Sequence, residues 1–153
     1  MMDVILIATC VLLYVLAGQP GWLADGPLAL RMMSYHFFHA NIAHLLVNGI
    51  AAATLFAPRH RDNIRVFAAG FVIASLVYPL SAQPCIGISN ILYAVIGLRT
   101  PPFTHRWWRS ASVVTFLAVT ASMLFIPGVS GLTHIVSLAA GIAAANIMRR
   151  WRS

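Results

Sequence analysis

The sequence contains no glutamate and no lysine, and only 8% of its 153 residues are charged. A soluble domain carries roughly a quarter of its residues as charged side chains, whereas 60% of this chain is hydrophobic. The shortage of charge excludes an ordinary soluble domain and indicates a polytopic membrane protein. The absence of glutamate also excludes the HExxH chemistry of zinc metalloproteases.

Cysteine is scarce as well. Cys10 and Cys85 are too few for a disulfide framework and belong to no metal-binding spacing such as CxxC. We expect Cys10 inside an apolar segment and Cys85 in a loop, and we predict no metal and no cofactor. The first residues lack the basic region and cleavage site of a signal peptide, so we expect them to form a retained span.

Apolar segments separated by proline-containing turn signals follow one another along the chain. A helical span needs about 20 apolar residues. The predicted spans are 2–18, 38–57, 64–81, 87–98, 110–126 and 131–148. The fourth is short, so we expect a helix that begins below the membrane surface and is entered by a loop that protein or water covers. We find no repeat and no linker, and we predict one all-α domain over residues 1–153.

The ten arginines give the chain a formal net charge of +7. Nine fall in the second connection, the fourth connection and the C-terminal end, and Arg31 alone falls in an odd-numbered connection. Arginine-rich loops of membrane proteins face the cytoplasm, so both termini are expected there. The expected membrane topology thus explains the net positive charge, and we predict no nucleic-acid partner. The starts of the second, fourth and sixth spans then lie together at the outer side.

Polar residues mark those three starts. In HANIAHLLVN, His44 and Asn48 are four residues apart and share a helical face, and His39 lies near the helix start. In GISNILYAVIG, Ser89 and Tyr93 share a face in the same way. Each segment alone fits structural packing between membrane helices, and the histidine pair also fits haem or metal binding.

The sixth predicted span supplies the partner for Ser89. In HIVSLAAG, His134 shares a helical face with Ser137 and Gly141, part of a small-residue stripe suited to close helix contact. If this stripe packs on the fourth span, His134 faces Ser89. A nucleophile and its base need hydrogen-bond reach. No carboxylate is placed to join them, so we expect a Ser–His dyad rather than a triad.

Together the three segments resemble the rhomboid family of intramembrane serine proteases. HANIAHLLVN is similar to the family's second-span histidine–asparagine motif, GISNILYAVIG to its fourth-span Gly-x-Ser motif, and HIVSLAAG to its sixth-span histidine. The resemblance implies a six-helix serine endopeptidase that cleaves transmembrane segments of proteins within the lipid bilayer. It also implies a bacterial inner-membrane location, with the active site opening to the outer, periplasmic side.

The resemblance also implies roles for single residues. Ser89 would be the nucleophile and His134 the general base. His44 and Asn48 would donate hydrogen bonds to the oxyanion together with the backbone N–H of Ser89.

Four further residues would support the site. His39 would support the start of the second span, Tyr93 would hold the imidazole, Gly87 belongs to the Gly-x-Ser motif, and Gly141 would let the helices approach closely.

Three positions depart from the family's pattern. Asn90 follows the serine where glycine is usual, so we expect its side chain beside the oxyanion hole. Ser137 replaces a usual glycine, and Leu30 precedes Arg31 where the family often has tryptophan. Asn90 favours the alternative of a rhomboid-like pseudoprotease that binds membrane helices without cleaving them, whereas the presence of Ser89 and a histidine partner favours the protease.

Overall fold

The computed structural model describes residues 2–17, 26–56, 62–80, 86–100 and 130–151. Each regular element in these ranges is a helix, which confirms the all-α class for this part of the chain. The helices are α1 (Met2–Ala17), α3 (Leu28–Ser34), η1 (Tyr35–Phe37), α4 (Ile42–Leu55), α5 (Asn63–Val77), η2 (Tyr78–Leu80), α6 (Ser89–Arg99) and α8 (Gly131–Arg150). The predicted span 110–126 lies outside the described residues.

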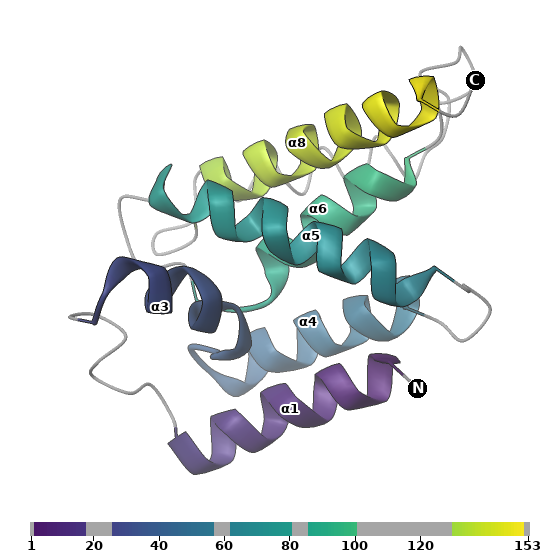
Figure 1. Cartoon of the computed structure of the whole chain (residues 1–153). Helices are drawn as coiled ribbons and strands as arrows, with labels where there is room; N and C mark the ends of the chain where they lie inside the picture. Colours follow the sequence, from purple (N-terminus) through teal and green to yellow (C-terminus); the bar gives the residue numbers. More distant parts are fainter. Residues whose placement is uncertain (1, 18–25, 57–61, 81–85, 101–129, 152–153) are drawn as a thin grey trace.

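Helix α6 occupies the centre of the bundle (Figure 1), in contact with α4, α5 and α8, and α1 packs against α4 at the edge. Its sequence, SNILYAVIGLR, is apolar around most of its circumference, as expected for a helix that is covered on all sides. Ile91, Ala94 and Val95 are fully buried there. In α1, by contrast, Val15 and Leu16 are largely exposed, as expected for a helix at the edge of the described bundle.

Two glycines allow α6 and α8 to cross at close range. A Cβ atom added at Gly97 would lie 2.3 Å from the carbonyl oxygen of Leu138, and one added at Gly141 would lie 2.3 Å from that of Ala94. Neither position has room for a side chain. The small-residue stripe expected on the sixth span therefore does pack on the fourth, in the manner of small-xxx-small contacts between membrane helices.

The second predicted span begins later than expected. Instead of one helix from residue 38, the segment Leu28–Phe37 meets Ile42–Leu55 at an angle of 79°. The reason is local: Asn41 is in an extended conformation and its side chain accepts a hydrogen bond of 2.9 Å from the backbone N–H of His44. Asparagine is a preferred N-cap, so it starts a new helix. The preceding helix α3 was not predicted.

Two of the described helical segments are long and apolar enough to cross a membrane, Asn63–Leu80 and Gly131–Arg150. The bent pair described above would make a third, and Asp3–Ala17 is apolar but shorter. The described helices therefore show fewer clear spans than the six expected, and the six-span topology stays a prediction.

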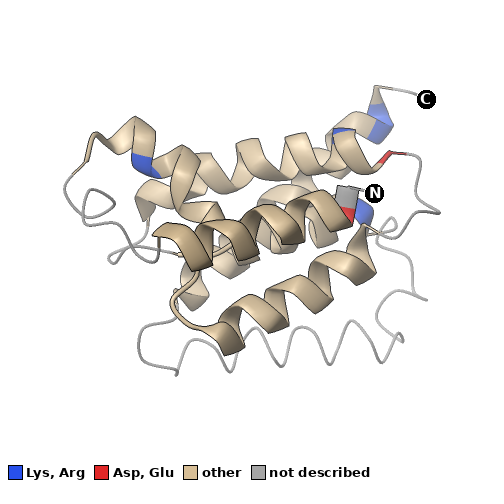
Figure 2. Ribbon diagram, turned by 90° about the horizontal axis from the view of Figure 1, so that it is seen from below, with Lys and Arg blue, Asp and Glu red and all other residues tan. Residues whose placement is uncertain are grey.

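Most of the described charged residues gather at one end of the bundle, where α1 begins and α8 ends, and Figure 2 shows one further basic residue at the other end. Arg99 was expected in a connection, but it is the last residue of α6 and is largely buried. Its guanidinium donates to the carbonyl oxygen of Leu55, donates to Asn63 Oδ1 at 2.6 Å and lies 3.5 Å from Asp62 Oδ1. Arg99 therefore ties the ends of α4 and α5 to α6.

Candidate active site

Ser89 begins α6, directly after a turn that only glycine tolerates easily. Gly87 has φ of 111°, in the region that side chains rarely adopt. A Cβ atom there would also lie 2.7 Å from His44 Cε1 and 3.1 Å from Asn48 Nδ2. Gly87 therefore brings the start of α6 against the two polar side chains of α4.

His134 of α8 reaches the hydroxyl group of Ser89. Its Nε2 atom lies 2.8 Å from Ser89 Oγ, the usual length of a hydrogen bond between a hydroxyl group and an imidazole nitrogen. The imidazole is buried and the serine is half-buried. The expected contact between the two residues is thus present, across the α6–α8 crossing that Gly97 and Gly141 permit.

Tyr93 fixes the plane of the imidazole. Its ring stacks on the His134 ring with centroids 4.5 Å apart and an interplanar angle of 11°. Among the described residues, His134 Nδ1 has no hydrogen-bond partner. The carboxylate of Asp62 lies next to Arg99, at the opposite end of α6 from Ser89. Within the described part of the chain, no carboxylate is therefore hydrogen-bonded to His134.

His44 and Asn48 lie one turn apart on α4, on the side that faces Gly87. Asn48 is buried, and its Nδ2 atom has no hydrogen-bond partner among the residues described. An unsatisfied buried donor costs free energy, so one that persists beside a candidate nucleophile suits a group that pairs with a ligand. His39 precedes α4 and packs edge-on against His44, with ring centroids 5.2 Å apart.

Asn90 lies elsewhere than expected. Its side chain is buried and faces α8, where Asn90 Oδ1 lies 3.1 Å from Thr133 Oγ1, whose one hydroxyl hydrogen is also within 2.9 Å reach of the carbonyl oxygen of Ser130. The expectation that this side chain lies beside the oxyanion hole is therefore wrong. Thr133 was not predicted to be a site residue, although it directly precedes His134 in the sequence. The Asn90–Thr133 pair joins α6 to α8 one residue away from each member of the dyad.

The remaining described histidines form no metal site with other described residues. In the ranges that the structure describes, no three histidine, cysteine or acidic side chains converge as metal ligands would. His36, which had no assigned role, is fully buried in η1 with Nε2 3.4 Å from Ser75 Oγ. This contact connects η1 to α5 and is structural. Cys85 lies outside the described residues, and Cys10 is buried.

Comparison with known proteins identifies the family of the chain. The Rhomboid domain model matches residues 28–151, which is most of the chain. No curated protein matches the chain. The matched region contains all the candidate site residues, and with the apolar helices it indicates an integral membrane protein. The chain therefore belongs to the rhomboid family.

Proposed function

We propose that the chain is an intramembrane serine endopeptidase in which Ser89 is the nucleophile and His134 the general base. The observation that carries the proposal is the distance of 2.8 Å between Ser89 Oγ and His134 Nε2. Membership of the rhomboid family supports it, because members are in general intramembrane serine proteases.

The proposed reaction proceeds in two stages. Ser89 Oγ forms a bond to the scissile carbonyl carbon while His134 Nε2 takes the hydroxyl proton, and the imidazolium then gives that proton to the leaving amine. In the second stage a water molecule attacks the acyl-enzyme and loses a proton to His134. The ester bond breaks and the proton returns to Ser89 Oγ. Stacking of Tyr93 keeps the imidazole in one plane throughout.

The negative oxygen of the intermediate would be bound between α4 and α6. The first N–H groups of a helix have no partner within the helix, and no described side chain caps α6. Among the described residues, the Ser89 N–H has no capping side chain and Asn48 Nδ2 has no hydrogen-bond partner, and Asn48 lies against Gly87, two residues before Ser89. His44 lies against the same glycine as Asn48. We assign the oxyanion hole to these three groups.

The substrate in this proposal is a transmembrane segment of another protein. Backbone N–H and C=O groups are costly to expose in lipid, so cleavage requires a segment that unwinds locally at helix-breaking or small residues. We further propose the six-span topology in a bacterial inner membrane, with arginine-rich ends in the cytoplasm and Ser89 toward the outer side.

Reaction with a serine-directed probe distinguishes the protease from the alternative of a helix-binding pseudoprotease. We expect the wild-type protein in lipid vesicles to react with a fluorophosphonate and to cleave a model transmembrane substrate, and the Ser89→Ala variant to do neither. A folded wild-type protein that neither reacts nor cleaves, yet binds the substrate helix, would instead support the pseudoprotease.

A further inference from the structure

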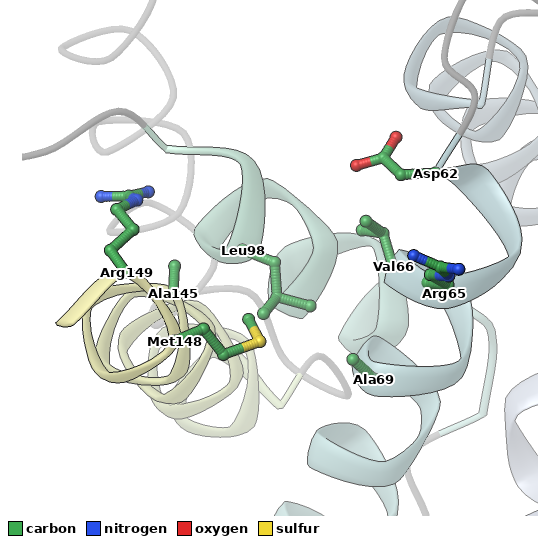
Figure 3. A pocket seen from close by; sticks show the side chains of 8 residues that line it. All are labelled: Asp62, Arg65, Val66, Ala69, Leu98, Ala145, Met148 and Arg149. Atoms are coloured by element: carbon green, nitrogen blue, oxygen red, sulfur yellow. The ribbon is translucent and has the colours of Figure 1, made fainter. Parts of the chain in front are cut away.

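A cavity lies at the end of the bundle opposite Ser89. Its volume is about 300 Å³, and it opens between α5, the end of α6 and the last turns of α8 (Figure 3). Its apolar wall consists of Val66, Ala69, Leu98, Ala145 and Met148. None of these residues belongs to the candidate active site, so the cavity needs a separate explanation.

Two arginines flank this cavity, Arg65 on α5 and Arg149 on α8, on opposite sides of the apolar wall (Figure 3). Arg65 is exposed and makes no hydrogen bond or ion pair with another described residue. Arg149 donates to Asn146 Oδ1 at 3.2 Å and to the carbonyl oxygen of Thr100. A guanidinium has five N–H donors, so Arg149 retains donors for a ligand.

The acidic residue at the cavity does not cancel this positive charge. Asp62 also lines the cavity. Its carboxylate lies 3.5 Å from the guanidinium of Arg99, and the two groups form an ion pair. With Asp62 paired to Arg99, the charge that faces a ligand is that of Arg65 and Arg149.

We propose that this cavity binds the headgroup end of an anionic phospholipid. The two guanidinium groups would contact the phosphate, for which their planar geometry is suited. The apolar wall would contact the glycerol and the first methylene groups, and the acyl chains would continue into the bilayer past Met148, whose side chain is partly exposed. Basic pockets between membrane helices at the charged side of a protein bind such headgroups.

The cavity's size and place favour this ligand. Its volume of about 300 Å³ is at the lower limit of ligand pockets, enough for a headgroup but not for a whole phospholipid. It lies where charged helix ends meet apolar helix faces, which is the depth of the lipid headgroups in an integral membrane protein. The inference requires that the chain is embedded in a membrane, but it does not require peptidase activity.

A bound lipid would connect the two helices that flank α6. Arg65 belongs to α5 and Arg149 to α8, and both helices pack on α6. A ligand that binds only the folded state stabilises it by an amount that grows with the logarithm of the ligand concentration relative to its Kd. Anionic phospholipid is therefore expected to raise the melting temperature of the bundle.

Native mass spectrometry of the Ser89→Ala protein, purified in detergent, tests the proposal independently of catalysis. With equal amounts of phosphatidylglycerol and phosphatidylcholine present, we expect preferential retention of one phosphatidylglycerol. Arg65→Gln should weaken that binding by on the order of fivefold. The matched control is Arg150→Gln, which removes an equal charge from a residue of α8 that does not line the cavity, and it should change binding much less.

Two further measurements complete the test. Ala69→Leu, which fills the cavity without changing charge, should also weaken retention of phosphatidylglycerol, and an excess of inorganic phosphate should fail to displace the lipid. Equal retention of the two lipids, equal effects of Arg65→Gln and Arg150→Gln, or displacement by phosphate alone would each overturn the proposal. Circular dichroism checks that each variant is folded.

Discussion

At the scale of single residues, the site depends on what surrounds the Ser89 hydroxyl. The imidazole of His134 lies 2.8 Å away, and Tyr93 stacks on that imidazole at 4.5 Å. Gly87 leaves room for His44 and Asn48 to approach from α4. These groups come from different turns and helices, so we expect the replacement of each one to have its own measurable effect on turnover or stability.

His44→Ala tests the oxyanion assignment. Loss of one oxyanion donor typically lowers the rate by about 10²–10³, so we expect kcat to fall by this factor. The side chain is only half-buried, and the melting temperature should change little. Cleavage kinetics with a model transmembrane substrate measure the effect. Unchanged turnover in the folded variant would show that His44 does not bind the oxyanion.

Thr133→Val tests the buried pair beside the dyad. The change keeps the shape of the side chain but removes the hydroxyl group that lies within hydrogen-bond distance of both Asn90 Oδ1 and the carbonyl oxygen of Ser130. Leaving a buried acceptor unpaired costs about 1–3 kcal/mol, and we expect that loss in the free energy of unfolding, with a lower kcat as Ser89 and His134 lose alignment. Thr54→Val is the control, because Thr54 is exposed on α4. Equal effects of the two changes would mean that the pair has no special role.

The sequence predicted the contact between Ser89 and His134 better than the surroundings of this pair. Spacing alone placed Ser89 with Tyr93 and His134 with Gly141, because a helix repeats its faces regularly. The direction of the Asn90 side chain could not be predicted in this way. It depends on Thr133 of another helix, and only the packed structure brings these two residues together.

At the scale of helices, the crossing of α6 and α8 determines whether nucleophile and base meet. Gly141→Ala should move the helices apart, because the added Cβ atom would lie 2.3 Å from the backbone oxygen of Ala94. Overpacking of this kind costs about 1–3 kcal/mol. We expect a lower melting temperature and a lower kcat.

Gly49→Ala is the matched control for this crossing. The nearest atom to its added Cβ would be Ile7 Cγ2 at 3.9 Å, an ordinary contact, and alanine favours a helix over glycine. Its melting temperature should stay constant or rise. If Gly141→Ala behaved like Gly49→Ala, the close crossing of α6 and α8 would not be needed for stability.

Helix boundaries were predicted less well than helix contacts. The run from Tyr35 to Ala40 is apolar or aromatic apart from its histidines, so hydropathy alone merges it with the following helix. The structure separates them because Asn41 caps α4. A cap is a matter of one side-chain hydrogen bond, which hydropathy averages over many residues cannot detect. The same averaging missed α3.

At the scale of the whole molecule, charge and chemistry occupy opposite ends of the bundle. Ser89 begins α6 and Arg99 ends it, and Arg65 of α5 and Arg149 of α8 lie near Leu98 in the last turn of α6 (Figure 3). This separation agrees with the expected topology, in which arginine-rich ends face the cytoplasm and the active site faces outward. Orientation in the membrane stays a prediction that cysteine accessibility at each end of the described helices would test.

The central claim is that His134 activates Ser89 as a nucleophile, and mass spectrometry of the fluorophosphonate-treated protein in lipid vesicles tests it most directly. We predict a single adduct, on the peptide that contains Ser89, and its loss in a folded His134→Ala variant. An adduct on another serine, or equal modification of Ser89 without His134, would contradict the claim.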